Sequence, residues 1–211
     1  MPVQIGQAEP GFDDPVGLMA ACHRRIERFL LVLVDLTTRR SGHGLNQQER
    51  AAMETALRYF LDAAPHHTAD EEDGLFPALE KDRGDEDGII SELELDHRRA
   101  EGLHRTVDRL GRLWLTAGSL AETKVVRLQA ALSELSALYL EHIRVEEQHV
   151  FPSARTLLSR EALAEIGRGM AARRGLSYIP AVVTAIAGSS CSTPIQRSGF
   201  IEVLQQQEKK D

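Results

Sequence analysis

Four long stretches of this 211-residue sequence repeat apolar residues with the 3.6-residue period of an α-helix, and this pattern restricts the fold more than any other feature. They cover residues 14–40, 46–76, 87–117 and 119–151. Short breaks containing Gly42, Gly84 and Gly118 separate them, and the period-2 alternation of strands is missing. Long helices with short connections pack side by side in alternating directions. The sequence therefore predicts an all-α, up-down-up-down four-helix bundle.

Helix-start signals agree with these limits. Asp14 precedes Pro15, which suits the first position of a helix. Asn46 and Ser119 are good N-cap residues, and Glu122 follows Ser119 at the spacing of a capping box. We therefore expect helices to begin after these three caps.

The bundle is expected to occupy residues 14–158, after an N-terminal extension of residues 1–13. The stretch SREALAEIGRGMAARRG predicts a short fifth C-terminal helix over residues 159–175, capped by Ser159 and ended by Gly175. Residues 176–211 are rich in Ser, Gly, Pro and Gln, so we expect a flexible tail. Within it, only IPAVVTAIA at 179–187 has the composition of a docking segment.

Composition excludes several classes of partner. A net charge of −7 argues against nucleic-acid binding, which needs a basic face. The N-terminus lacks the basic and apolar regions of a signal peptide, and no apolar run reaches the ~20 residues of a membrane span. We therefore expect a cytoplasmic protein that binds neither nucleic acid nor a membrane; its protein partner, if any, is unknown from the sequence. With only Cys22 and Cys191 available, a metal site would have to use His and carboxylates.

Each of the four predicted helices places a His on its apolar stripe. In the second and fourth helices a Glu follows the His four residues later, on the same stripe. An uncompensated buried carboxylate would cost several kcal/mol, so this pattern favours a metal site over a purely structural bundle. The six candidate ligands are His23, His67, Glu71, His97, His142 and Glu146.

The two halves of the sequence repeat each other. HRRIE at 23–27 matches HRRAE at 97–101, and HHTADEEDGLFP at 66–77 matches HIRVEEQHVFP at 142–152. Two helical hairpins related by a pseudo-twofold axis would provide two equivalent half-sites. The repeat therefore predicts a dinuclear centre.

The spacing within each repeat has a chemical reason. A His and a Glu four residues apart lie about one helical turn apart and can reach one metal cluster. The next Glu, at 72 or 147, is rotated away and should meet solvent or a partner beside the ligands. Two His per metal and two bridging carboxylates give each ion about four of six octahedral donors. Positions remain for an oxo or hydroxo bridge and a small exogenous ligand.

The pattern H…HxxxEExx[LV]FP…H…HxxxEExx[LV]FP resembles the hemerythrin-like HHE cation-binding domain over residues 14–158. The resemblance implies a cofactor of two non-haem iron ions in a four-helix bundle, held by the six residues named above. Members of that family bind dioxygen, respond to nitric oxide or peroxide, sense iron, or help to repair iron–sulfur clusters.

The sequence departs from the oxygen-carrying hemerythrins at two places. Those proteins have a second His four residues after the third-helix His, where this chain has Glu101, and a bridging Asp five residues after the fourth-helix His, whereas Glu146 stands at four. The ligand set is closer to that of the di-iron repair proteins, but their Cys-bearing N-terminal domain is absent from this sequence.

Three other His residues leave alternatives open. His66 could pair with Asp70 in place of His67, although alignment with His142 favours His67. His104 and His149 are expected to face inward about 10 Å further along the axis, as core residues or as partners of the ligands.

Other polar residues near the stripe have two interpretations. Glu27 and Glu101 could ligate, but rim salt bridges with Arg25 or Arg99 are the simpler interpretation. Tyr59 and Tyr139 are expected to pack in the core, and the arginine pairs at 24–25, 98–99 and 173–174 to lie on solvated faces.

The function expected from these features is binding or sensing of a small molecule, dioxygen or nitric oxide, in a stress response. The alternatives are a di-iron oxidoreductase that acts on peroxide or nitric oxide, and an iron donor for iron–sulfur cluster repair. The ligand set does not separate these classes, and catalysis is left open.

Overall fold

The apolar stripes form helices along the part of the chain that the computed structural model describes, residues 10–83, 85 and 87–179. No strand occurs among these residues, so the all-helical prediction is confirmed for them. The elements in chain order are α1 (Pro15–Arg40), α2 (Gln47–Asp62), α3 (Ala64–Asp70), the π-helical turn η1 (Glu71–Leu75), α4 (Phe76–Arg83), α5 (Ile89–Ala117), α6 (Glu122–Val145), the π-helical turn η2 (Glu146–Val150), α7 (Phe151–Leu157) and α8 (Arg160–Arg173).

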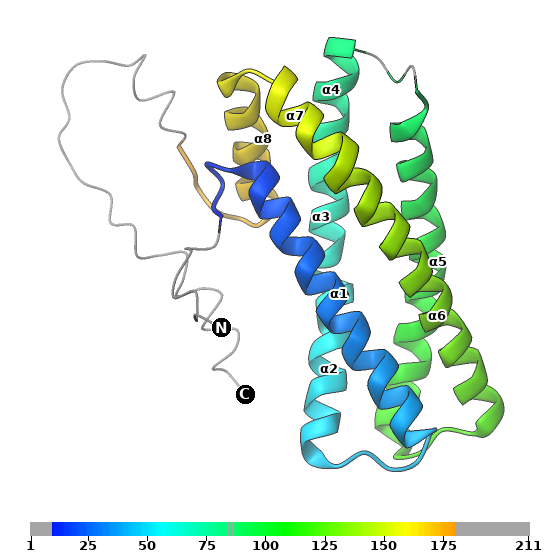
Figure 1. Cartoon of the computed structure of the whole chain (residues 1–211). Coiled ribbons are helices and arrows are strands. Elements are labelled where there is room, and N and C mark those ends of the chain that lie inside the picture. The colour runs from blue at the N-terminus through cyan, green and yellow to red at the C-terminus, as the bar shows by residue number, and fades with distance from the viewer. Residues whose placement is uncertain (1–9, 84, 86, 180–211) are drawn as a thin grey trace, which may run out of the picture.

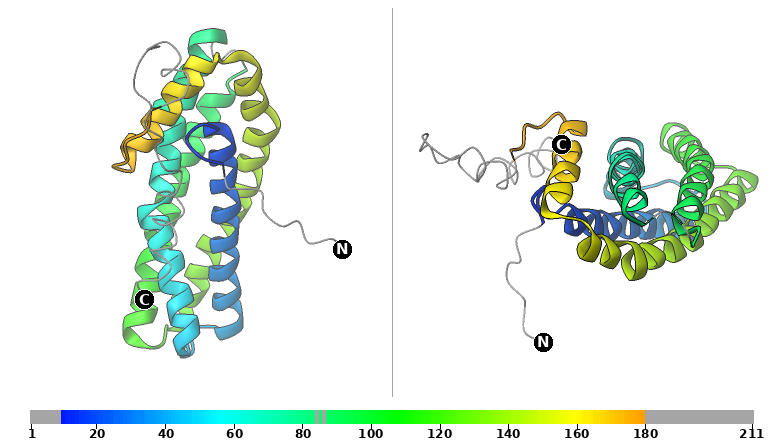
Figure 2. Two further views of the ribbon diagram at one scale, coloured as in Figure 1. Left: turned by 90° about the vertical axis from the view of Figure 1, so that its left-hand side faces the viewer. Right: turned by 90° about the horizontal axis from the view of Figure 1, so that it is seen from above.

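The long helices lie side by side (Figure 1). α2, α3, η1 and α4 continue one another along one line, and α6, η2 and α7 do the same. α1 and α5 each contact both α2 and α6, so the four lines enclose a common interior. α8, the predicted fifth helix, packs on α1, α3 and η1 near the end where α1 begins (Figure 2). The predicted tail lies outside the described residues from position 180 onward.

The helix caps follow the sequence with one exception. Asp14 accepts a hydrogen bond from the Gly17 amide, and Asn46 forms its capping box with Glu49. Ser159 caps α8 as predicted. The predicted cap at Ser119 is wrong, because α6 begins later, at Glu122.

A loop contact explains the late start of α6. The Leu120 amide donates to the Gly42 carbonyl at 2.8 Å, and the Leu120 side chain is buried. This pairing holds the α5–α6 connection against the α1–α2 loop, so the backbone cannot turn into a helix directly after Ser119.

The second predicted helix is interrupted near Pro65. Proline has no amide hydrogen to donate to the preceding turn, and the helix breaks between Asp62 and Ala64. The second and fourth segments also continue past their predicted ends, to Arg83 and Leu157. Pro152 does not end its segment because it stands in the first turn of α7, where a missing amide hydrogen costs little.

The apolar core consists of two clusters. One contains residues of α1, α2, α5 and α6 such as Ile26, Leu57 and Leu135. The other lies toward α8 and contains Met19, Leu75 and Phe76 among others. The predicted ligands fall in sequence between members of the two clusters, so a polar layer separates them. No helix of the described residues is long and apolar enough to cross a membrane.

Gly167 of α8 marks the closest approach between this helix and the N-terminal segment. A Cβ added to Gly167 would lie 2.0 Å from the carbonyl oxygen of Phe12, whereas one added to Gly169 would lie 3.6 Å from the end of the Arg173 side chain. We predict that Gly167→Ala destabilises the protein by about 1–3 kcal/mol, since α8 or Phe12 must move. Gly169→Ala should be neutral or stabilising by up to about 1 kcal/mol, because alanine is the better helix former.

Urea denaturation of both variants measures these changes in the free energy of unfolding. Equal stability of the two variants would contradict the close packing of α8 against Phe12.

Candidate metal centre

Six polar side chains meet in the layer between the two apolar clusters. Five of them are buried, and the side chain of the sixth, His97, is 7% exposed. They are His23 of α1, His67 of α3, Glu71 of η1, His97 of α5, His142 of α6 and Glu146 of η2. The structure thus brings together all six residues that the sequence singled out.

The six side chains form two groups that share the carboxylates. His23, His67, Glu71 and Glu146 make the first group, with one potential ligand atom from each within 4.8 Å of all the others. Glu71, His97, His142 and Glu146 make the second group by the same criterion. Two His per group and two shared Glu correspond to the dinuclear arrangement that the sequence repeat predicts.

Several of these atoms lie at or near contact distance. His23 Nε2 lies 3.0 Å from Glu146 Oε2, and His67 Nε2 lies 3.1 Å from Glu71 Oε1. In the second group the two Nε2 atoms of His97 and His142 are 3.1 Å apart, and each lies 3.4 Å from a carboxylate oxygen, of Glu71 and Glu146 respectively.

The carboxylates are close to these nitrogens but are not hydrogen-bonded to them. Both oxygens of Glu71, both oxygens of Glu146 and Nε2 of His23 are buried without a hydrogen-bond partner among the described residues. Buried polar atoms in native proteins almost always have a partner, and buried charges are paired or coordinate metals. Imidazole nitrogens and carboxylate oxygens are ligands of first-row transition metals such as iron. The residues present therefore fit a pair of metal ions.

The pKa values reflect the two buried anions. Burial alone lowers the pKa of His23, but its contacts with Glu146 and Glu71 outweigh burial and raise the pKa to about 10. His97 behaves in the same way: burial lowers its pKa, and the contacts with Glu71 and Glu72 raise it to about 9. Protons on these two imidazoles partly neutralise the carboxylates when no metal does so.

The other charges of the layer follow from the same contacts. Burial raises the pKa of Glu71, but the charges and contacts of His67, His23 and His97 bring it well below its usual range. The pKa of Glu146 is also lowered, because its contacts with His142 and His23 outweigh burial and the charge of Glu71. Burial dominates at His67 and lowers its pKa.

A second Glu follows each shared carboxylate and contacts a His from outside the layer. Glu72 Oε1 lies 2.8 Å from His97 Nδ1, and Glu147 Oε1 lies 3.0 Å from His23 Nδ1. The sequence predicted that these Glu would meet solvent or a partner beside the ligands, and they do both: their side chains are 36% and 43% exposed.

The carboxylates four residues after His23 and His97 do not join the layer. Glu27 is exposed, and the side chain of Glu101 is 70% exposed and pairs with Arg105. The predicted partner of Glu101 was wrong, since Arg99 pairs with Asp96. His66 belongs to neither group.

His104 and Tyr139 form a hydrogen-bonded pair on the side of the layer away from α8. His104 Nε2 lies 2.9 Å from the Tyr139 hydroxyl, and burial lowers the pKa of His104 to about 4, so the imidazole is neutral. The rings of Tyr139 and His142 are in edge-to-face contact, with centroids 6.2 Å apart. Tyr59 packs against Phe29 as a core aromatic residue.

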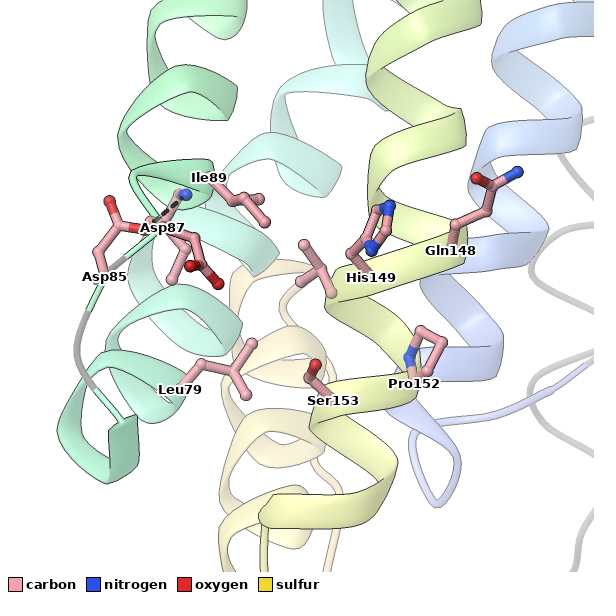
Figure 3. Close-up of a pocket in the computed structure, with 10 residues that line it drawn as sticks. Leu79, Asp85, Asp87, Ile89, Gln148, His149, Pro152 and Ser153 are labelled. Atoms are coloured by element: carbon pink, nitrogen blue, oxygen red, sulfur yellow. Dashed lines mark hydrogen bonds between the residues drawn. The ribbon is translucent and has the colours of Figure 1, made fainter.

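His149 does not face inward as predicted. It is exposed and lines a surface cavity of about 220 Å³, together with residues of the α4–α5 connection (Figure 3). The cause is η2: its turn holds one more residue than an α-helical turn, so Val150 takes the buried position that α-helical spacing assigns to His149.

Asp70 was considered in the sequence only as a possible partner of His66, and its burial was missed. Asp70 is fully buried and pairs with Arg173 Nε at 2.8 Å and Arg174 Nη2 at 2.7 Å. The arginine pair at 173–174 therefore joins α8 to α3, and its predicted place on a solvated face is wrong. The available signal was the position of Asp70, three residues after His67 on the same helix face.

Comparison with known proteins agrees with this geometry. Residues 14–154 match the family model of the hemerythrin HHE cation binding domain. An uncharacterized protein of Haemophilus influenzae is 32% identical over 167 residues, which cover 77% of this chain and 91% of that protein. The chain therefore belongs to the hemerythrin HHE cation-binding domain family.

Proposed function

We propose that this protein holds two non-haem iron ions in an up-down-up-down four-helix bundle and binds or senses dioxygen or nitric oxide in a stress response. His23 and His67 would ligate one ion, His97 and His142 the other, and Glu71 and Glu146 would bridge them. The observation that carries the proposal is that both groups of four donors contain the same two carboxylates.

The donor count favours binding of a small ligand. Two imidazoles and two carboxylate oxygens give each ion about four of six octahedral positions. An oxo or hydroxo bridge and one small exogenous molecule would fit the remaining positions. Iron would supply reversible one-electron chemistry and affinity for diatomic molecules.

The surroundings of the six side chains favour a ligand of diatomic size. None of the six lines the 220 Å³ cavity beside His149 or the 530 Å³ cavity between α4 and α8. Apolar residues of both core clusters flank the layer, which limits access for water and larger substrates. We expect a diatomic gas to reach such a layer through small side-chain movements more readily than a larger substrate would.

Oxygen-free purification and loading with Fe²⁺ test this function directly. We expect about two iron ions per chain, in keeping with two donor groups, and an optical charge-transfer band that forms with dioxygen or nitric oxide and disappears when the gas is removed. Sustained turnover of peroxide or nitric oxide would instead indicate an oxidoreductase. Transfer of the iron to a cluster-free acceptor would indicate an iron donor, and absence of bound metal would leave a structural bundle.

Adjacent histidines provide a matched pair of variants. His67→Ala should lose most of the bound metal, since it removes one of the two imidazoles of the first group, while His66→Ala should keep it. Elemental analysis of the two purified variants measures the difference. Equal metal content would show that the imidazole of residue 67 is not a ligand.

Metal uptake should release protons at neutral pH. A His must be neutral to bind a metal, and the pKa values of His23 and His97, about 10 and about 9, keep both protonated at pH 7 without metal. We therefore expect release of about two protons per chain between pH 6.5 and 8, and an affinity that rises with pH in this range. Calorimetric titration with Co²⁺ in two buffers of different ionisation enthalpy measures the proton count. A heat that is the same in both buffers would contradict the raised pKa values.

A further inference from the structure

The Glu residues at 72 and 147 occupy equivalent places in the two repeats. Each side chain is partly exposed, and each places Oε1 within 3.0 Å of the Nδ1 atom of a His whose Nε2 atom lies in the layer. An exposed carboxylate would lose little by remaining fully in water. The contact with an imidazole that is almost completely buried is therefore the feature that needs an explanation.

The π-helical turns make this contact possible. The Phe76 amide donates to the Glu71 carbonyl, and the Phe151 amide donates to the Glu146 carbonyl, each five residues back. A wider turn rotates successive residues by a smaller angle than an α-helix does. Two adjacent carboxylates can then point to the same side of the helix, the first into the layer and the second to its edge.

The contacts cross between the two groups. Glu72 is on the line of helices that supplies His67 to the first group, but it contacts His97 of the second group. Glu147 is on the line that supplies His142 to the second group, but it contacts His23 of the first.

Of the four imidazoles in the layer, only those of His23 and His97 receive this contact from a second Glu, and neither has a Glu four residues later that reaches the layer. His67 and His142 each lie beside the shared carboxylate four residues on in the same line of helices. His23 and His97 have no such neighbour, because Glu27 and Glu101 are exposed. Neither His67 Nδ1 nor His142 Nδ1 has a hydrogen-bond partner among the described residues, and His142 Nδ1 lies 3.9 Å from Asp96 Oδ2, beyond hydrogen-bonding distance.

We propose that Glu72 and Glu147 are positioning residues that fix the tautomer and ring orientation of His97 and His23. Glu72 follows His67 of the first group but acts on the second group, and Glu147 follows His142 of the second group but acts on the first. A carboxylate at Nδ1 accepts a hydrogen bond from the Nδ1–H group, which keeps the proton on Nδ1 and the lone pair on Nε2, the atom that faces the layer. The proposal rests on the dinuclear site proposed above. Each donor group already takes one carboxylate from each repeat, and the contacts of Glu72 and Glu147 add a second dependence of each group on the opposite repeat.

The test compares full-length variants by Co²⁺ titration against a competing chelator. Glu72→Ala and Glu147→Ala should each weaken one of the two bound ions by about 10–100-fold and leave the other near its wild-type affinity. Glu72→Gln and Glu147→Gln should restore most of the affinity, because the amide oxygen still accepts the Nδ1 proton. Asp73→Ala is the control: Asp73 is exposed, adjacent to Glu72 and carries the same charge, so its removal should change nothing.

A spectroscopic measurement separates positioning from a general charge effect. In the Co²⁺-loaded protein, the shifted Nδ1 proton signal of His97 should be lost or exchange faster in Glu72→Ala but persist in Glu72→Gln and Asp73→Ala. The signal of His23 should respond to Glu147 variants in the same way. Equal weakening by the Ala and Gln variants, or by Asp73→Ala, would overturn the positioning role.

The two proposals fail in different ways. If the wild-type protein binds no pair of Co²⁺ ions, the dinuclear function is wrong. If it binds two, and Glu72→Ala and Glu147→Ala match it in affinity and in their Nδ1 signals, the dinuclear function stands and the positioning role is wrong.

Discussion

Two carboxylates buried in the middle of an apolar bundle are the constraint on which the rest of the structure depends. Glu71 and Glu146 are completely inaccessible, and none of their oxygens has a hydrogen-bond partner among the described residues. A fold can retain such groups only if positive charge surrounds them. His23 and His97, whose pKa values are raised by the two carboxylates, supply this charge as bound protons, and metal ions bound by the four imidazoles would supply it in their place. The two apolar clusters on either side exclude water and strengthen these interactions, because charges attract more strongly where the dielectric constant is low.

The twofold character of the site does not extend to its surroundings. Asp70 pairs with Arg173, the last residue of α8, and with Arg174, which follows it, whereas the corresponding residue of the second repeat, 75 positions later, is Val145. α8 therefore covers the first repeat, where Ile166 lies beside Gly74. In the second repeat the residue that corresponds to Gly74 is His149, which lines an open cavity (Figure 3). The helices that carry His23, His67 and Glu71 are thus packed against a fifth helix, whereas no such helix packs on η2 among the described residues.

The sequence alone predicted the helices and the six central residues because both depend on spacing that is local to each helix. The same spacing failed after Glu146, since α-helical periodicity cannot show that a turn will widen to a π-turn. His149 was predicted to face inward for this reason, but Val150 occupies the core position that was predicted for His149. Asp70 and the late start of α6 were missed for another reason. They depend on contacts with Arg173 and with Gly42, which are distant in sequence and which periodicity does not reveal.

The doubled Glu in each repeat has a physical explanation in this geometry. An α-helix offers one inward position per turn at this level, so a single Glu would suffice to reach the layer. The π-turn brings a second, adjacent side chain to the same edge, where it meets a His from another helix. The backbone gives up regular α-helical hydrogen bonding at η1 and η2, an arrangement that occurs often at functional sites. Because Glu27 and Glu101 are exposed, neither group gains a further carboxylate, and each consists of two imidazoles and the two shared Glu.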